Sequence, residues 1–119
     1  MKKVLVIGGS GFLGSHTADE LSRRGFKVTI FDRIESPWLR PEQSMHVGEL
    51  LDLESVEKAM VGADAVYHFA GIADINDAGR RPFETINLNV LGTTGIVDLA
   101  VKLQVKRFIF ASSMYVYSS

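Results

Sequence analysis

A glycine-rich turn between two regular elements is the feature of this sequence that most constrains its fold. Residues 4–7 form an apolar, β-branched run, which is typical of a short strand buried on both faces. Four glycines, at positions 8, 9, 11 and 14, follow before the chain takes on a helical period. A strand, a tight turn and a helix N-terminus in this order present free backbone N–H groups and the positive end of a helix dipole to an anion.

The spacing of these glycines matches dinucleotide-binding turns in two ways. Gly9, Gly11 and Gly14 give G-x-G-x-x-G, whereas Gly8, Gly11 and Gly14 give G-x-x-G-x-x-G, and spacing does not choose between the two. A Cβ at such a turn would block the close approach of a pyrophosphate. No Gly-Lys-Ser/Thr sequence occurs, which excludes a mononucleotide P-loop. The turn therefore predicts a dinucleotide site, the alternative being a tight turn without a ligand.

A carboxylate follows the second predicted strand, where a dinucleotide's ribose is expected. Residues 27–31 are typical of a strand, and Asp32 lies 18 residues after Gly14. A carboxylate can accept hydrogen bonds from both ribose hydroxyls and repels a 2′-phosphate, which favours NAD over NADP. Arg33 beside it favours the phosphate instead, so NADP is the less favoured alternative.

Strands and helices alternate along the rest of the sequence. Further strands are expected at residues 45–47, 63–71 and 106–111, and helices at residues 12–24, 54–60 and 83–103. This alternation predicts an α/β fold of Rossmann type, with a doubly wound parallel sheet of strand order 3-2-1-4-5. Residues 72–82 are expected to be a polar loop, either a solvated segment or a lid over the crevice. His68 is expected to be a packed strand residue.

Composition narrows the functional class. The net charge of −1 gives no indication of nucleic acid or of an anionic membrane as a partner. The chain has no cysteine, which excludes disulfides and thiol catalysis and is compatible with a cytoplasmic location. The apolar run before Gly8 is too short for a signal peptide, and no stretch approaches the length of a membrane span. We expect no metal site.

Six short motifs follow one another along the chain. They are IGGSGFLG at 7–14, Asp32, GELLD at 48–52, HFAG at 68–71, NVLGT at 89–93 and FIFASS at 108–113. In this combination the chain resembles the extended short-chain dehydrogenase/reductases, the group of NAD-dependent nucleotide-sugar epimerases and dehydratases. The similarity is strongest to UDP-glucose 4-epimerase-like proteins and covers essentially the whole chain.

The resemblance implies a cofactor-binding role for the residues that match these motifs. They are Gly8, Gly11, Phe12, Leu13, Gly14, Asp32, Asp52, Leu53, Phe69, Ala70, Gly71 and Asn89, with Arg33 added as the neighbour of the ribose acid. Phe12 and Leu13 would supply amides to the pyrophosphate. Asp52 and Leu53 would flank the adenine, although from the residues alone Asp52 fits a helix N-cap better.

Ser113 matches the serine or threonine that hydrogen-bonds the reacting sugar hydroxyl or carbonyl of a nucleotide-sugar substrate. Family members also use a Tyr-x-x-x-Lys pair, in which the lysine lowers the tyrosine pKa so that tyrosine serves as a base. Here Tyr67 and Tyr115 are followed four places on by glycine and serine. We therefore expect residues 1–119 to be the NAD-binding Rossmann part of an epimerase or dehydratase, truncated before the Tyr-x-x-x-Lys helix and the substrate lobe, and catalytically inactive as given.

Two alternatives stay open: a non-catalytic NAD(P)-binding sensor of the same fold, and a structural domain with a vestigial site. One further expectation concerns the helix at residues 83–103. It carries an apolar stripe of Ile86, Val90, Val97 and Val101. Without a following helix packed beside it, apolar surface on the order of several hundred Å² would be exposed, a scale that marks interfaces. We therefore expect self-association through this helix face.

Overall fold

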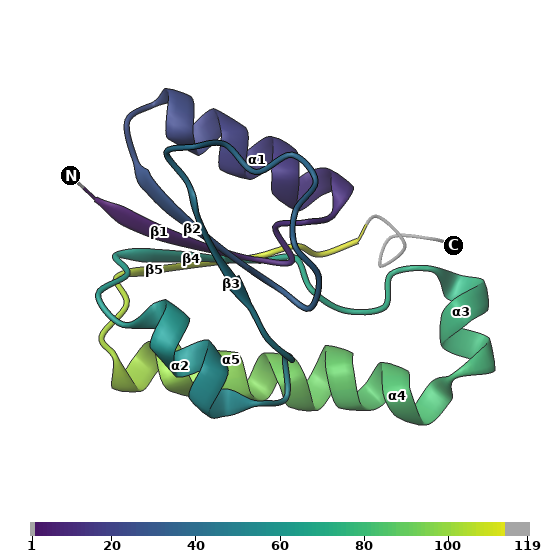
Figure 1. The fold of residues 1–119 in the computed structure, drawn as a ribbon. Helices are drawn as coiled ribbons and strands as arrows, with labels where there is room; N and C mark the ends of the chain where they lie inside the picture. Colours follow the sequence, from purple (N-terminus) through teal and green to yellow (C-terminus); the bar gives the residue numbers. More distant parts are fainter. Residues whose placement is uncertain (1, 114–119) are drawn as a thin grey trace.

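A five-stranded parallel sheet forms the middle layer of the molecule (Figure 1). The computed structural model describes residues 2–113. The strands are β1 (Lys3–Ile7), β2 (Lys27–Asp32), β3 (Ser44–Val47), β4 (Ala65–His68) and β5 (Arg107–Phe110). Their order in the sheet is β3-β2-β1-β4-β5, and every neighbouring pair is parallel. The predicted strand order is thus confirmed.

Helices cover both faces of this sheet. Helix α1 (Phe12–Arg23) lies on one face, while α2 (Leu53–Met60) and α5 (Thr93–Lys102) lie side by side on the other (Figure 1). Helix α1 ends within one residue of the boundary expected at residue 24, and Gly25 follows it with a φ of +91°, a conformation that favours glycine.

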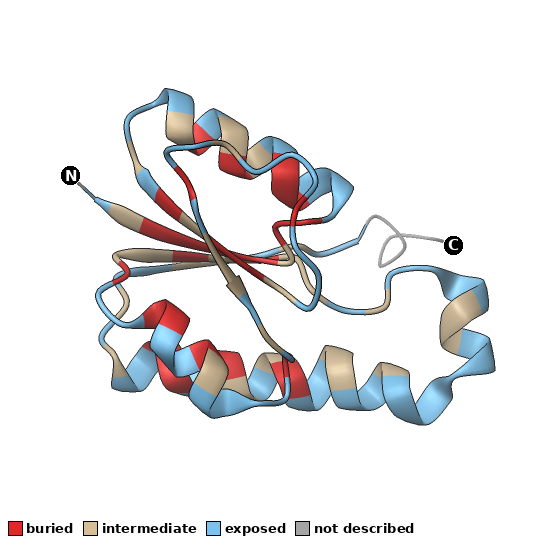
Figure 2. Ribbon diagram, in the orientation of Figure 1, coloured by how far each residue is buried: buried red, intermediate tan, exposed pale blue. Residues whose placement is uncertain are grey.

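The alternating side chains of β1 divide the core into two clusters. Val4 and Val6 pack with Val28 and Leu21 on the α1 side. Leu5 and Ile7 point to the opposite face, where Met60 and Ile96 belong to the second cluster. Because both faces of β1 are covered, the strand has no polar side, which explains the continuous apolar run in its sequence. In Figure 2 the buried residues accordingly line the sheet and the inner sides of α1, α2 and α5.

The expectation of a polar loop over residues 72–82 is wrong in part. A short helix, α3 (Ile75–Arg80), interrupts it, and α4 (Pro82–Ile86) begins directly afterwards. The Asp74 carboxylate caps α3 by accepting hydrogen bonds from the backbone of Asn76 at 2.8 Å and Asp77 at 3.0 Å. Helix α3 buries no residue, so no apolar period reveals it in the sequence (Figure 2).

The long helix expected at residues 83–103 is a helical rod of three parts. It runs from α4 through a π-helical turn, η1 (Asn87–Gly92), into α5 (Figure 1). Ile96, Leu99 and Ala100 form its buried side. The four residues of the predicted apolar stripe, Ile86, Val90, Val97 and Val101, are all exposed. Across residues 2–113, no helix is long and apolar enough to span a membrane.

Shortening a buried side chain of α5 should lower the free energy of unfolding far more than shortening an exposed side chain. Ile96 is fully buried between the sheet and α2, so Ile96→Ala leaves a cavity and should lower the free energy of unfolding by about 3 kcal/mol. Val61→Ala, at an exposed position just after α2, should change it by less than about 0.5 kcal/mol. Urea denaturation measures both. Similar losses for the two variants would contradict this placement of α5.

Candidate functional site

The glycine turn links the carboxyl end of β1 to α1 and leaves amides free at the helix N-terminus. Gly8 adopts a φ of +83°, donates its N–H to Phe31 O at 2.8 Å and accepts one from Gly11 N at 3.2 Å. The backbone bond that opens α1 runs from Ser15 N to Gly11 O at 2.9 Å. The amides of residues 12–14 come before that bond, so they are available to an anion.

The glycines of the turn differ in whether the packing of the protein requires them. A Cβ on Gly8 would lie 2.7 Å from Ala70 N, and one on Gly14 would overlap Gly8 O. A Cβ on Gly9 would lie 2.5 Å from the Ile30 side chain. At Gly11, by contrast, the nearest atom to a Cβ would be Gly8 O at 3.5 Å, an ordinary contact. Packing inside the protein therefore does not require glycine at position 11.

Gly11 borders two cavities at the carboxyl ends of β1 and β4. We call the first, of about 290 Å³, the Asp32 cavity, and the second, of about 660 Å³, the Ser113 cavity. Both are lined by the glycine turn and by the segment after β4, through Gly8, Gly11, Phe69, Ala70, Gly71 and Ile72. This is the point where the strand order reverses, with β2 on one side of β1 and β4 on the other. The arrangement offers two adjacent compartments that share one floor, which fits a dinucleotide with its pyrophosphate over the turn.

Asp32 lies in the Asp32 cavity with its carboxylate held by backbone donors. Its Oδ2 accepts a hydrogen bond from Ser10 N at 3.0 Å, and its Oδ1 accepts one from Arg33 N at 2.7 Å. The Ser10 hydroxyl donates to Ile34 O at 2.8 Å and so ties the following segment to the turn. The carboxylate therefore has a defined position, and Arg33 lines the same cavity.

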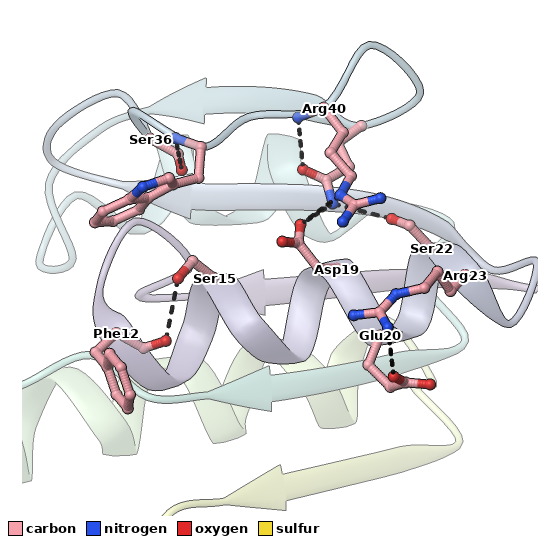
Figure 3. Close-up of polar contacts among 10 residues, drawn as sticks. Phe12, Ser15, Asp19, Glu20, Ser22, Arg23, Ser36 and Arg40 are labelled. Atoms are coloured by element: carbon pink, nitrogen blue, oxygen red, sulfur yellow. Dashed lines mark hydrogen bonds and ion pairs between the residues drawn. The ribbon is translucent and has the colours of Figure 1, made fainter.

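Polar contacts attach the segment after Asp32 to α1 (Figure 3). Arg40 pairs with Asp19 at 3.0 Å, and its backbone N–H donates to Gln43 Oε1 at 3.1 Å. The buried Gln43 amide donates in turn to Ser22 Oγ at 3.0 Å and to Asp19 Oδ1 at 3.2 Å. These bonds order an irregular segment that the sequence only indicates to be a loop, and they hold it against α1.

Asn89 fixes the floor shared by the two cavities. Its side-chain oxygen accepts from Ile72 N at 2.7 Å, and its amide donates to Ile72 O at 2.8 Å. Gly71 beside this pair has a φ of +139°, and a Cβ there would lie 2.5 Å from Asn89 Oδ1. Asn89 itself lines the Ser113 cavity, so the helix side chain and the segment after β4 form one wall.

His68 is buried at the end of β4 and lines the Ser113 cavity. Its Nε2 lies 2.9 Å from Thr93 Oγ1, in hydrogen-bond contact, whereas its Nδ1 has no hydrogen-bond partner among the described residues. Burial lowers the pKa of His68 to about 4, so the ring is neutral at physiological pH. The expectation of a packed strand residue agrees with this burial.

Acid should destabilise the protein through His68. The folded-state pKa is about 4 and the unfolded value about 6.5, so the unfolded state binds the additional proton between these pH values. As the pH falls from 6.5 to 4, His68 should lower the free energy of unfolding by about 3 kcal/mol. Urea denaturation of His68→Asn should show a correspondingly shallower acid loss, whereas the exposed-site variant His16→Asn should follow the wild type. A wild-type slope in His68→Asn would contradict this account.

The structure brings most of the predicted site residues together. Gly14, Phe12, Leu13 and Ser113 line the Ser113 cavity. Asp52 and Leu53 are not among the described lining residues of either cavity: Asp52 caps α2, accepting from Ser55 N at 3.4 Å. Their contact with adenine stays a prediction. Tyr115, considered above for the Tyr-x-x-x-Lys pair, lies outside the described residues.

Several lining residues escaped the sequence reasoning. In the Asp32 cavity they are Phe31, Gly48, Glu49, Leu50, Arg81, Glu84 and Leu88, and in the Ser113 cavity they include Thr93 and Phe110. Gly48, Glu49 and Leu50 do stand next to Asp52 in the GELLD motif, which was the available signal. Arg81 and Glu84 had no such signal, because the segment expected at residues 72–82 and the helix expected at residues 83–103 carry no motif at these two positions.

The fold and the paired cavities define a dinucleotide-binding α/β domain. A model of the NAD dependent epimerase/dehydratase family matches residues 4–119, and the chain belongs to this family. The resemblance drawn from the motifs is thereby confirmed.

Individual relatives agree with this assignment. The chain is 31% identical over 132 residues to the bifunctional UDP-glucose 4-epimerase and UDP-xylose 4-epimerase 3 of Arabidopsis thaliana, covering 98% of this chain and 38% of the relative. The UDP-glucose 4-epimerase of Brucella ovis in complex with NAD matches with a TM-score of 0.92 and 30% identity, over 100% of this chain and 38% of that one. The UDP-glucose 4-epimerase of Bifidobacterium longum in complex with NAD+ and UDP matches with a TM-score of 0.88 and 31% identity, over 98% of this chain and 38% of that one. The chain thus spans about 38% of the length of these relatives.

Proposed function

We propose that this chain binds NAD across the Asp32 and Ser113 cavities, with the pyrophosphate over the glycine turn. The observation that carries the proposal is that Gly11 lines both cavities although packing does not require glycine there, since the nearest atom to a Cβ would be Gly8 O at 3.5 Å. Glycine there serves the close approach of a ligand rather than the packing of the chain. The solved relatives from Brucella ovis and Bifidobacterium longum are complexes with NAD.

We assign the adenosine half of NAD to the Asp32 cavity. Asp32 accepts hydrogen bonds from the ribose hydroxyls there, while Phe31 and Leu50 supply apolar walls for the base. A second negative charge at the ribose 2′ position would face the Asp32 carboxylate, so NADP is the weaker ligand. The nicotinamide half belongs in the Ser113 cavity, whose described lining residues carry no acidic or basic chain apart from the neutral His68.

We further propose that the whole protein is a nucleotide-sugar epimerase or dehydratase, with residues 1–119 as its cofactor-binding part. NAD, when bound, supplies the hydride acceptor. Ser113 lines the nicotinamide-side cavity and is assigned to orient a sugar hydroxyl or carbonyl there. A sensor that only binds cofactor would have no use for that hydroxyl, which favours the enzyme. The 119 residues contain no Tyr-x-x-x-Lys, so we expect them alone to bind cofactor without turnover, in a cytoplasmic setting.

Substitution of Gly11 should separate cofactor binding from folding. Gly11 has a φ of −81° and a ψ of 179°, which alanine adopts without strain, so Gly11→Ala should leave the free energy of unfolding within about 1 kcal/mol of wild type. The new methyl group would occupy the pyrophosphate position, and NAD affinity should fall at least about tenfold, or by about 1.4 kcal/mol. Isothermal titration with NAD, and with NADP as the weaker ligand, measures this.

The matched control is Gly79→Ala, because Gly79 has open space around its Cβ position and does not line either cavity. This variant should bind NAD like the wild type. Absence of NAD binding by the wild-type chain would refute the proposed function, and unchanged affinity in Gly11→Ala would refute the placement of the pyrophosphate.

We also propose that the chain self-associates through the apolar stripe of the helical rod. Phe83 is 87% exposed near the start of the rod, and Val101 is 71% exposed near its end. Apolar residues exposed at both ends of a rod give a second copy apolar surface to cover. Val101→Glu should weaken association at least about tenfold in sedimentation equilibrium, because a buried unpaired charge is costly. Val61→Glu, on another exposed element, should not, and a wild-type chain that sediments as a monomer at high concentration would exclude the contact.

A further inference from the structure

A cationic side chain reaches the Asp32 cavity from outside the sheet. The segment that leaves β4 forms α3, which lies apart from the strands, and then leads back along α4 toward α5 (Figure 1). Arg81 lies at the junction of these two helices, and it lines the Asp32 cavity together with Gly8 and Gly11 of the glycine turn. The α3–α4 segment thus faces the turn across the same cavity.

The charges around the cavities leave a clear role for such a cation. A dinucleotide's diphosphate is anionic, and the glycine turn offers it only uncharged amides. Among the described lining residues of both cavities, the cationic side chains are Arg33 and Arg81. Arg33 directly follows the ribose acid Asp32, whereas Arg81 approaches from the opposite, helical wall. Arg81 is therefore the cation that can complete a two-sided diphosphate site.

The present partner of Arg81 is one that a phosphate can replace. Arg81 Nη1 lies 3.1 Å from Glu84 Oε2, and the two side chains are 45% and 44% exposed. An ion pair so accessible to water is weak. A guanidinium can bind phosphate oxygens with two parallel hydrogen bonds, a stronger arrangement than a single contact with a solvated carboxylate.

We propose that Arg81 is a cofactor-binding residue that contacts the diphosphate of the bound dinucleotide, exchanging Glu84 for phosphate oxygens. The proposal rests on the proposed function, since it requires NAD in the two cavities. It assigns to the α3–α4 segment a direct part in cofactor binding. Glu84 then competes with the ligand for Arg81 and places a negative charge near the phosphates.

The test compares neighbouring arginines by isothermal titration at low salt with NAD, ADP and adenosine. Arg81→Ala should weaken NAD and ADP binding about tenfold and leave adenosine binding unchanged. The matched control is Arg80→Ala, which removes the same charge one residue away from a side chain that is 78% exposed and does not line the described cavities. It should bind all three ligands like the wild type. Glu84→Gln should tighten NAD binding about two- to threefold, the opposite sign from Arg81→Ala.

The outcomes distinguish a failure of the Arg81 contact from a failure of the proposed NAD binding. A wild-type chain that binds no NAD overturns both. If the wild type binds NAD and Arg81→Ala binds it equally tightly, the role of Arg81 is refuted and the proposed function stands. Equal losses in Arg81→Ala and Arg80→Ala would mean a general effect of charge, and a loss of adenosine binding in Arg81→Ala would mean contact with the base; either result rejects the diphosphate contact. Parallel losses in Arg81→Ala and Glu84→Gln would mean a structural ion pair and would also reject it.

Discussion

The close passage of the glycine turn against the segment after β4 is the constraint on which the rest of the molecule depends. At Gly8 the two backbones approach so closely that a Cβ would lie 2.7 Å from Ala70 N, and at Gly14 the first turn of α1 lies directly on Gly8 O. A side chain at Gly8 would separate the turn from the segment after β4, and one at Gly14 would push α1 away from the turn. The two cavities share a floor because this contact brings the ends of β1 and β4 together.

The strand order and the cofactor side of the site could be predicted because local signals and topology rules agree there. Residues 4–7 are apolar on both faces, as a central parallel strand must be, and α1 ends within one residue of its expected boundary. Asp32 follows from its distance along the chain after the glycine turn. In each case a few neighbouring residues contain the whole reason for the structure.

The opposite wall could not be predicted, because its residues are chosen by tertiary contacts. Helix α3 is capped by Asp74 and buries no residue, so the sequence has no hydrophobic periodicity that would predict it. The long helix has apolar residues on two sides, and period alone does not say that Ile96 faces the core while Val97 faces outward. The adenine assignment of Asp52 rests on resemblance, whereas its capping of α2 follows from its own side chain.

The π-helical turn has a consequence for the geometry of the helical rod. It places Asn89 against Ile72 and, four residues later, Thr93 against His68, so two successive turns both reach the end of the sheet. A π turn contains one residue more than an α-helix needs, and each residue advances a helix by about 100°. The parts of the rod before and after η1 are therefore out of phase by about that angle. Loss of one residue there would keep the rod helical but rotate its amino-terminal part, with the α3–α4 segment attached, around the helix axis and away from the cavities.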